Sequence, residues 1–315
     1  MIIKVNGLTL KNSYLEEIVK RIKTKKELSS VLDSIIINEI RTFSYLNYSK
    51  LKKAMSKADT LSEFTKSVYF KDCIKFCRSR LRKKAGLYLK SMDEKKISEI
   101  SKFEDNEIKK ILLAHKSSFE RYEYYPKIYD QIFQKLNKKS FSSSQNVFTI
   151  LDLGCGLNPL SYLFFEEKLF KTSNYLALDI DKRALKIVNI FFKQKSLNGK
   201  TFHMDVSELT KQKYLTGRTA KKEIMTRKTN DFSCDLVFVF KLLELIEKKG
   251  HKNSERLITS LDAKMIVASF PKKTISGKSM KVIKKPWLER MLNRLNYAFE
   301  TFEIPTEIFY LIYKR

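Results

Sequence analysis

The chain has 315 residues, of which 43% are hydrophobic, enough to build two modest globular domains with cores of their own. Its 63 Lys and Arg residues outnumber its 35 Asp and Glu residues, which leaves a formal net charge of +28. An excess of this size is typical of a protein that attracts a polyanion. A nucleic acid is therefore the leading candidate partner, ahead of a merely solvated basic surface and of a membrane surface.

The composition also argues against several protein classes. No segment reaches about 18 uncharged apolar residues, and the apolar run after Met1 is too short for a signal peptide, so we expect a cytoplasmic protein without a membrane partner. The four cysteines are too few and too scattered for a disulfide framework, and the three histidines are too dispersed for a metal site. Cys73 and Cys77 share one face of a predicted helix, where we expect them to be small core residues.

Helical periodicity dominates the first 140 residues. Apolar residues recur at helical spacing over Leu15–Ile22 and again over Leu28–Ile36. Thr60–Glu63 and Ser101–Glu104 have the hydroxyl-to-carboxylate spacing that caps a helix start. We therefore predict an all-helical domain over residues 1–140, followed by a polar linker over Ser140–Gln145.

Beyond this linker the pattern changes to short β-rich runs that alternate with helical stretches. The predicted strands cover residues 147–153, 174–180, 200–206, 235–240 and 264–270, and the predicted helices begin near Pro159 and cover Lys182–Gln194 and Leu242–Lys249. This alternation predicts a parallel sheet built from right-handed crossovers. The basic span 211–230 indicates an insertion between the third and fourth strands.

The chain ends differently from the rest of this half. A helix around Trp287–Leu295 is followed by two predicted strands, residues 297–305 and 307–315, separated by one short turn. A terminal antiparallel hairpin on an otherwise parallel sheet is the usual arrangement of Rossmann-like methyltransferases, and not of nicotinamide-binding domains. We therefore predict an α/β methyltransferase domain of the Rossmann-like type over residues 141–315.

The first predicted strand of this domain leads into a loop with two glycines, Gly154 and Gly156. Glycines here let the chain turn sharply and let a ligand approach the backbone, and free N–H groups at the following helix start favour negative charge. A dinucleotide fingerprint requires a third Gly or Ala three positions after the second, where this chain has Pro159. Proline fits the first position of a helix better, which weakens the NAD interpretation.

Acidic residues close the next two predicted strands. Asp179 stands where a carboxylate can accept two hydrogen bonds from a ribose diol. Asp205, at the end of the third strand, could accept from an adenine amino group or could instead cap the following helix. The loop and the two acids together indicate an adenosine-containing cofactor.

Several segments together resemble the small-subunit (16S) ribosomal RNA guanine-N7 methyltransferases of the aminoglycoside-resistance type. The resemblance is carried by DLGCGLNPL at Asp152–Leu160, YLALDID at Tyr175–Asp181, DLVFVFKLLELIE at Asp235–Glu247 and VASFPKKTISGK at Val267–Lys278. AHKSSFER at Ala114–Arg121 is a looser match to a histidine followed by a Ser-Thr-Arg-Glu-Arg run, with Phe119 in place of the first arginine. The chain is similar to this family as a remote relative, with an archaeal source as one option.

The resemblance implies S-adenosylmethionine as the cofactor. Gly154 and Gly156 would then pass under its methionine part, Asp179 would bind the ribose and Asp205 would lie at the adenine. Arg121 could pair with the cofactor carboxylate, or form an i,i+4 pair on its own helix. The residues assigned to the cofactor are Arg121, Asp152, Gly154, Gly156, Asp179, Asp205 and Val206.

Two basic groups of residues are predicted to bind RNA phosphates. One lies just after the fourth strand and on the loop after the fifth, where the methyl group should emerge, and the other lies in the run Arg78–Lys84, which could also be a solvated helix face. The predicted RNA-binding residues are Arg80, Arg82, Lys241, Lys272, Lys273 and Lys278. The expected partner is small ribosomal subunit RNA, bound by a monomer whose helical N-terminal domain grips the RNA.

Guanine N7 carries an in-plane lone pair, so its methylation requires no general base, and positioning can supply much of the catalysis. Phe238, Phe240 and Phe270 could line an apolar pocket for the sulfonium, or could simply be core residues. Methylation of the small-subunit RNA would confer aminoglycoside resistance or serve ribosome maturation. Adenine-N1 methylation, a non-catalytic rRNA-binding protein and a nicotinamide oxidoreductase are the alternatives.

Overall fold

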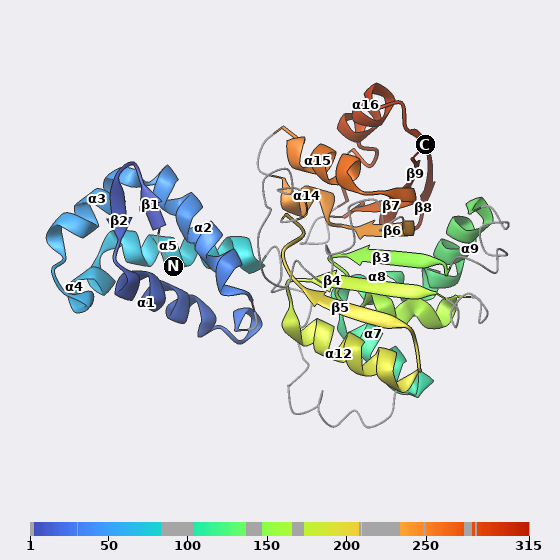
Figure 1. Cartoon of the computed structure of the whole chain (residues 1–315), viewed down its shortest axis with the longest axis horizontal. Coiled ribbons are helices and arrows are strands. Elements are labelled where there is room, and N and C mark those ends of the chain that lie inside the picture. Colours follow the sequence, from blue (N-terminus) through green and yellow to red (C-terminus); the bar gives the residue numbers. More distant parts are fainter. Residues whose placement is uncertain are drawn as a thin grey trace. The chain divides into compact units, whose positions relative to one another are not determined.

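The computed structural model of this protein falls into two compact units (Figure 1). One comprises Met1–Ser91 with Ile180–Lys182, and the other comprises Met92–Asp179 with Arg183–Arg315. The structure describes residues 3–29, 31–82, 104–136, 147–165, 173–207, 209, 234–247, 250–273, 279–280 and 282–314. The predicted linker at 140–145 and the basic span 211–230 lie outside the described residues.

The first unit is a small hairpin followed by helices. Its elements are β1 (Ile3–Val5), β2 (Leu8–Leu10), α1 (Asn12–Lys23), η1 (Lys26–Leu28), α2 (Asp33–Leu46), α3 (Tyr48–Lys57), α4 (Leu61–Lys66) and α5 (Val68–Leu81). The predicted cap of α4 is confirmed, because the backbone N–H of Glu63 donates to Thr60 Oγ1 at 3.3 Å and the Thr60 N–H donates to Glu63 Oε2 at 3.1 Å. Cys73 and Cys77 are fully buried in the core of this unit, as expected.

The hairpin is a difference from the all-helical prediction. Val5 pairs with Leu8, so the loop is Asn6 and Gly7, and both have positive φ angles, +46° and +85°. A two-residue hairpin turn of type I′ needs positive φ at both positions, and Asn-Gly is the dipeptide that supplies it most readily. The signal was present in the sequence but is outweighed by the helical periodicity that begins a few residues later.

The second unit is built on a mixed sheet in the order β5-β4-β3-β6-β7-β9-β8. Its strands are β3 (Thr149–Leu153), β4 (Asn174–Asp179), β5 (Gly199–His203), β6 (Cys234–Phe240), β7 (Ala263–Pro271), β8 (Ala298–Glu303) and β9 (Glu307–Tyr313). The strands from β5 to β7 are parallel, and β9 runs antiparallel to both β7 and β8. The predicted parallel sheet with a terminal antiparallel hairpin is confirmed.

Helices surround this sheet. They are α7 (Asp105–Ala114), α8 (Lys116–Arg121), η3 (Tyr122–Tyr124), α9 (Tyr125–Lys135), η4 (Asn158–Phe164), α12 (Lys182–Gln194), α14 (Leu243–Ile246), α15 (Lys252–Ser260) and α16 (Pro286–Arg294). Helices α7 to α9, from the segment assigned by sequence to the helical domain, belong to the second unit. The predicted helix near Pro159 is confirmed as η4, a 3-10 helix with Pro159 in its first turn.

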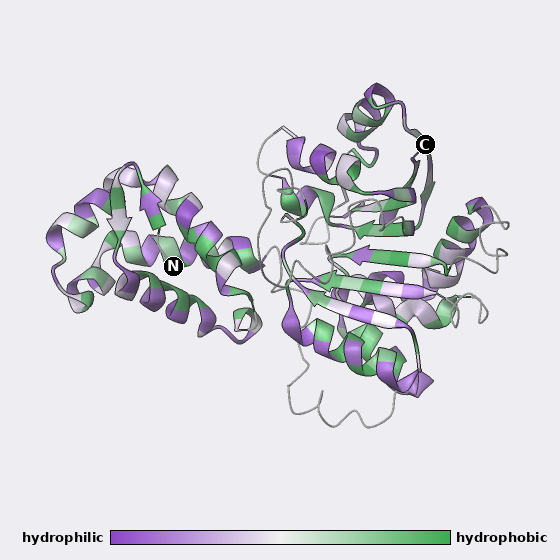
Figure 2. Ribbon diagram, in the orientation of Figure 1, coloured by the Kyte–Doolittle hydropathy of each residue, from purple (hydrophilic) through white to green (hydrophobic). Residues whose placement is uncertain are grey.

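The core lies on both faces of the sheet, as the apolar middle strands in Figure 2 indicate. On β6, Phe238 packs against Tyr129 of α9, while Val237 and Val239 join a cluster with Leu257 of α15 on the other face. A strand buried on both faces is typical of a parallel sheet covered by helices. No helix in the described part of the chain is long and apolar enough to cross a membrane.

This topology brings the candidate residues to one edge. The parallel strands all end at the same edge, with Asp179 closing β4 and Phe240 closing β6. Because β9 is antiparallel, its first residue, Glu307, lies at that edge too, paired with Pro271 of β7. Ligands of open α/β sheets bind at the carboxyl ends of the strands, so a ligand site is expected at this edge.

Candidate active site

The glycine loop after β3 is tightly enclosed. Gly154 and Gly156 have φ angles of +66° and +51°, in the left-handed region that favours glycine. A Cβ added at Gly154 would lie 3.0 Å from Leu242 Cδ1, and one at Gly156 would lie 3.2 Å from two ring atoms of His115. The loop therefore passes between the chain that leaves β6 and the residue that caps α8, with no room for side chains at either glycine.

Most backbone N–H groups of this loop donate within the fold. Gly154 and Cys155 both donate to the carbonyl oxygen of Leu178, at 2.8 and 3.1 Å, and Gly156 donates to Asp179 Oδ2 at 2.7 Å. The N–H of Asn158 donates to the Cys155 carbonyl, and Pro159 has none. This hydrogen bonding differs from the expectation that free N–H groups would attract negative charge, because a pyrophosphate site needs such donors pointing at the ligand.

Asp179 fits a ribose diol in position and chemistry. It closes β4 and is 92% buried, with one oxygen accepting from the Gly156 N–H. An ionised carboxylate offers about four lone-pair sites, and the bond to Gly156 occupies one of them. The bond also holds the loop at a fixed distance from the strand end.

Asp205 and Val206 follow β5. Asp205 Oδ1 accepts from the N–H of Ser207 at 2.8 Å, which is the local capping that the sequence left open for this residue. Val206 is buried and joins the core cluster of Leu153 and Leu178, beside the ends of β3 and β4. The carboxylate is thus held by its own turn, at the edge that also carries Asp179.

Asp152 holds the loop from below. It is fully buried, and its Oδ2 accepts from Asn158 Nδ2 at 2.9 Å and from the Tyr175 hydroxyl at 2.7 Å. Burial raises the pKa of Asp152 to about 6, although these two donors favour the ionised form. Tyr125 of α9 also donates to Asn158 Oδ1 at 3.3 Å, so Asn158 joins Asp152 to the helix. Sequence reasoning noted Asn158 as part of a motif but missed its role as a bridge.

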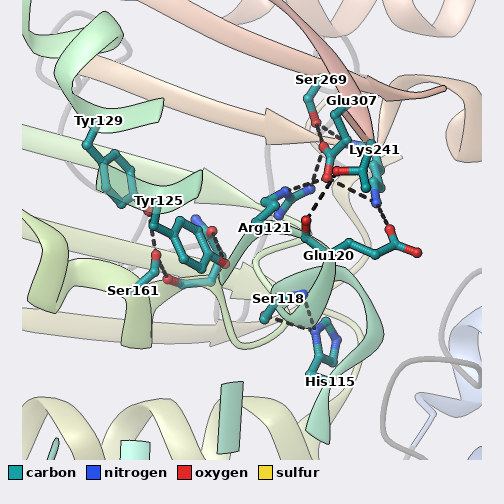
Figure 3. Close-up of polar contacts among 12 residues, drawn as sticks. His115, Ser118, Glu120, Arg121, Tyr125, Tyr129, Ser161, Lys241, Ser269 and Glu307 are labelled. Atoms are coloured by element: carbon teal, nitrogen blue, oxygen red, sulfur yellow. Dashed lines mark hydrogen bonds and ion pairs between the residues drawn. The ribbon is translucent and has the colours of Figure 1, made fainter. Parts of the chain in front are cut away.

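A cluster of charged side chains lies at the same edge (Figure 3), and we call it the Glu307 cluster. Arg121 donates from Nε and Nη2 to the two carboxylate oxygens of Glu307, at 2.7 and 3.0 Å. Ser269 donates to Glu307 Oε2 at 2.7 Å. Lys241 Nζ lies 3.0 Å from Glu307 Oε1 and 2.6 Å from Glu120 Oε2. Five side chains thus join α8, β7, β9 and the turn after β6.

The charges of the Glu307 cluster balance, two cations against two anions. Burial alone would raise the pKa of Glu307, but Arg121 and Lys241 outweigh it and hold that pKa below its ordinary value. The guanidinium of Arg121 also lies over the ring of Phe240, 4.7 Å from its centroid. Charges buried in this way persist only when paired and hydrogen-bonded, as they are here.

The cluster changes the interpretation of two predicted residues. The side chain of Arg121 is bound by Glu307 and not by a residue on its own helix, so the i,i+4 alternative is wrong. The side chain of Lys241 is only 11% exposed and is held by two carboxylates, rather than open to a phosphate. The turn carrying Lys241 is itself unusual, with a φ angle of +53°. No sequence signal indicates these pairs, because Arg121 and Glu307 are 186 residues apart.

The other predicted phosphate-binding residues differ in their surroundings. Lys272 pairs with Glu303 at 2.7 Å, Lys273 is exposed, and Lys278 lies outside the described residues. In the first unit Arg80 pairs with Glu39 at 2.5 Å, and Arg82 is half-buried at the end of α5. Among the described residues no group of three metal-ligating side chains is found.

His115 is a site residue that the sequence analysis missed. It caps α8, where its Nδ1 accepts from the Ser118 N–H at 3.4 Å, and its ring fills the space beside Gly156. The three phenylalanines considered for the pocket wall are buried, and Phe238 and Phe270 are core residues. Phe240 is the one that contacts the cluster, beneath Arg121.

The family follows from comparison with known proteins. Residues 104–313 match the family model described as "Ribosomal RNA methyltransferase (FmrO)". The chain belongs to this ribosomal RNA methyltransferase family. The match covers the whole candidate site, from His115, which caps α8, to Glu307 at the start of β9.

Individual relatives agree with this assignment. A 16S rRNA (guanine(1405)-N(7))-methyltransferase of Proteus mirabilis is 27% identical over 221 residues, covering 64% of this chain and 69% of the relative. One of the same name from Serratia marcescens is 26% identical over 246 residues, covering 78% of this chain and 84% of the relative. The resemblance of this methyltransferase to the 16S rRNA guanine-N7 family is confirmed.

Solved structures confirm the fold. The 16S rRNA methylase RmtB superposes with a TM-score of 0.61 at 22% identity, covering 96% of this chain and 98% of the other. The 16S rRNA methyltransferase RmtF, solved in complex with S-adenosyl-L-homocysteine, superposes with a TM-score of 0.63 at 17% identity, covering 97% and 100%. The family member described here therefore has the Rossmann-like methyltransferase fold that its sequence predicts.

Proposed function

We propose that this ribosomal RNA methyltransferase transfers a methyl group to N7 of a guanine in the decoding site of small-subunit rRNA. The methyl donor is S-adenosylmethionine. The observation that carries the proposal is the glycine loop, in which the N–H groups of Gly154, Cys155 and Gly156 donate within the fold and so are not offered to a pyrophosphate. Such a loop suits a ligand without a pyrophosphate, which favours a methyl donor over NAD.

The cofactor roles follow from this loop. Asp179 binds the ribose hydroxyls, Asp205 accepts from the adenine amino group, and Val206 supplies an apolar contact beside the base. The methionine part passes over the loop at Gly154 and Gly156, whose positive φ angles set the course of the backbone there. Asp152 acts indirectly, because its bond to Asn158 sets the shape of the loop.

Arg121 is proposed to reach the cofactor carboxylate while its bidentate pair with Glu307 holds the guanidinium in place. Two of the guanidinium nitrogens are committed to Glu307, so this contact would depend on the cluster being intact. The proposed carboxylate contact would therefore weaken if Glu307 were neutralised, even though Glu307 itself need not touch the cofactor.

Catalysis rests on positioning. The cofactor supplies a methyl group on a positively charged sulfur, and guanine N7 supplies the lone pair, so no residue has to remove a proton. The loop after β6 holds Leu242 against Gly154 and Lys241 within the Glu307 cluster, which fixes the edge at which the target base must arrive. The charge-balanced cluster places no unpaired ion beside this step, in which positive charge passes from the sulfonium to the methylated guanine.

The proposed substrate is the small ribosomal subunit. We propose that this protein binds it as a monomer in the cytoplasm. Lys272, Lys273 and Lys278, which follow β7 in the chain, would bind phosphates near the target. Arg80 and Arg82 would bind phosphates on the first unit, which is the part of the predicted 1–140 helical domain that forms a compact unit of its own and is proposed as the RNA-binding accessory domain. Lys241 would reach a phosphate only by exchanging Glu120 for it. Methylation of the decoding site would confer aminoglycoside resistance or serve ribosome maturation.

Methyl transfer from labelled S-adenosylmethionine to purified small ribosomal subunits tests this proposal. We expect label in the RNA of small subunits and none in that of large subunits incubated in parallel. Tight binding of S-adenosylmethionine without any transfer to RNA would instead support a non-catalytic rRNA-binding protein. Tight binding of NADH in its place would defeat the cofactor assignment.

A further inference from the structure

Two aromatic rings stack on the surface of the second unit, outside the site described above. His251, which precedes α15, and Trp287, at the start of α16, lie with ring centroids 4.0 Å apart and planes 5° from parallel. Trp287 is half-buried, whereas His251 is exposed. Since one face of the imidazole lies against the indole, the exposure of His251 comes from its opposite face and its edges.

The stack is supported from beneath by further rings. Trp287 meets Phe270 edge to face at 6.0 Å, and Phe270 meets Tyr310 in the same way at 5.8 Å. The Tyr310 hydroxyl accepts from the buried N–H of Lys285 at 2.8 Å and donates to Glu289 at 2.9 Å. Because Phe270 lies next to the last residue of β7, this chain of contacts fixes the surface rings relative to the strand end.

The backbone at His251 is constrained as well. Gly250 and His251 have consecutive positive φ angles, +72° and +57°. A non-glycine residue in this region is uncommon and persists only where its surroundings determine it, and such residues concentrate at binding sites. Nothing lies within 4 Å of a Cβ placed on Gly250, so the turn itself, not crowding, calls for glycine there.

Two exposed lysines adjoin the stack along the chain. Lys252 follows His251 directly and Lys284 precedes Trp287 by three residues. Within the part of the chain that the structure describes, neither forms an ion pair within 4.0 Å, although Lys252 helps to lower the pKa of Glu255, which pairs with Arg294. Of the other acids nearby, Glu244 pairs with Lys285 and Glu289 accepts from the Tyr310 hydroxyl. The local charge is therefore suited to phosphates.

We propose that the outer face of His251 stacks an unpaired base of the RNA substrate. Every base has a π-face that can stack on an aromatic ring, and RNA loops present such bases splayed out between phosphates. α15 follows β6 and α16 follows β7, so both rings come from connections that leave the carboxyl edge where Asp179 lies. The inference rests on the proposed function and adds a base-binding subsite to it.

Variants of His251 in the full-length protein test the subsite. His251→Ala should raise the KM for small subunits by about 5-fold to about 100-fold, the range expected when one stacked base is lost, and should leave kcat and S-adenosylmethionine affinity unchanged. His251→Tyr restores a flat ring and should recover most of the lost affinity. His251→Lys introduces a positive charge without a ring and should not recover it.

The proposal would be overturned by an unchanged KM in His251→Ala, or by equal recovery of affinity for small subunits in His251→Lys and His251→Tyr. It would also be overturned if the melting temperature fell in step with the rise in KM across these variants, because the stack would then serve only to stabilise the packing of α15 against α16. Filter binding of wild type and His251→Ala to small subunits separates this inference from the proposed function. If wild type binds without methylating, the proposed activity fails while the comparison of affinities still decides the subsite.

Trp287 offers an independent readout, because it is the only tryptophan in the chain. Its fluorescence reports on the stack directly. Addition of a single-stranded oligoribonucleotide should change the emission of the wild type at concentrations where a duplex of the same sequence has little effect. Emission that stays constant at saturating small subunits would contradict the subsite.

Discussion

Replacing Glu307 by Gln is the sharpest perturbation of the site, because Glu307 is fully buried and receives Arg121, Lys241 and Ser269. Gln keeps the size of the side chain but removes the negative charge, so two buried cations are left with Glu120 alone. Removing one partner of a buried ion pair costs about 3 to 5 kcal/mol, because the remaining charge stays desolvated. We expect a loss of that order in the free energy of unfolding, measured by denaturant titration.

Glu303→Gln is the matched control for this experiment. Glu303 lies on the adjacent strand β8 and pairs with Lys272 at 2.7 Å, but its side chain is 43% exposed. An exposed pair contributes about 1 kcal/mol or less, since water already solvates both ions. Equal losses in the free energy of unfolding for the two variants would refute the claim that burial makes the ion pairs of Glu307 contribute more stability than an exposed pair. Adding Lys241→Met to Glu307→Gln should recover part of the loss, because it removes one stranded cation.

The pH dependence of the Glu307→Gln effect has a definite sign. The neighbouring cations hold the pKa of Glu307 below its ordinary value of 4.5 in the folded state. A carboxylate of this kind contributes its full stability above the unfolded-state pKa and loses it as the pH falls through the folded-state pKa. The stability difference between wild type and Glu307→Gln should therefore be constant near neutral pH and narrow below about pH 4.5.

Three further predictions concern the loop and its carboxylates. Asp179→Ala should weaken S-adenosylmethionine binding by at least about 10-fold, because it removes a hydrogen-bonded carboxylate, and unchanged affinity in calorimetry would defeat the ribose assignment. Burial raises the pKa of Asp152 in the folded protein to about 6, so the free energy of unfolding should fall as the pH rises from about 4 to 6. Asp152→Asn should abolish this pH dependence in unfolding measurements, with little loss of stability near neutral pH. Gly156→Ala should destabilise more than Gly250→Ala. Both positions have positive φ angles, but only Gly156 has His115 beside it, and equal losses in thermal unfolding would show that the contact is unimportant.

The sequence predicted the sheet domain well because its signals there are local. Lys182–Gln194 was predicted as a helix with the bounds that α12 has, and the strand predictions fall within a few residues of β3 to β9. Buried parallel strands are short apolar runs closed by polar residues, and the terminal hairpin has one short turn. These features need no knowledge of distant contacts.

The electrostatics of the site could not be predicted in the same way. The sequence shows that Lys241 is a cation but not whether its side chain faces solvent or carboxylates. Its two partners, Glu120 and Glu307, come from α8 and β9, which are distant in the sequence. The position of Pro159 in the first turn of η4 agrees with the sequence, because proline suits the start of a helix. The bonds of Asn158 to Asp152 and Tyr125 are tertiary contacts, which the local sequence does not indicate.

The most direct measurement of the central claim is the identity of the methylated nucleotide. Small subunits treated with the protein and S-adenosylmethionine can be cleaved chemically at N7-methylguanine, and the cleavage mapped by primer extension. The account predicts one new stop, at a guanine of the decoding site, that depends on both protein and cofactor. Labelled RNA without such cleavage, or a primer-extension stop at an adenine, would contradict guanine N7 as the target.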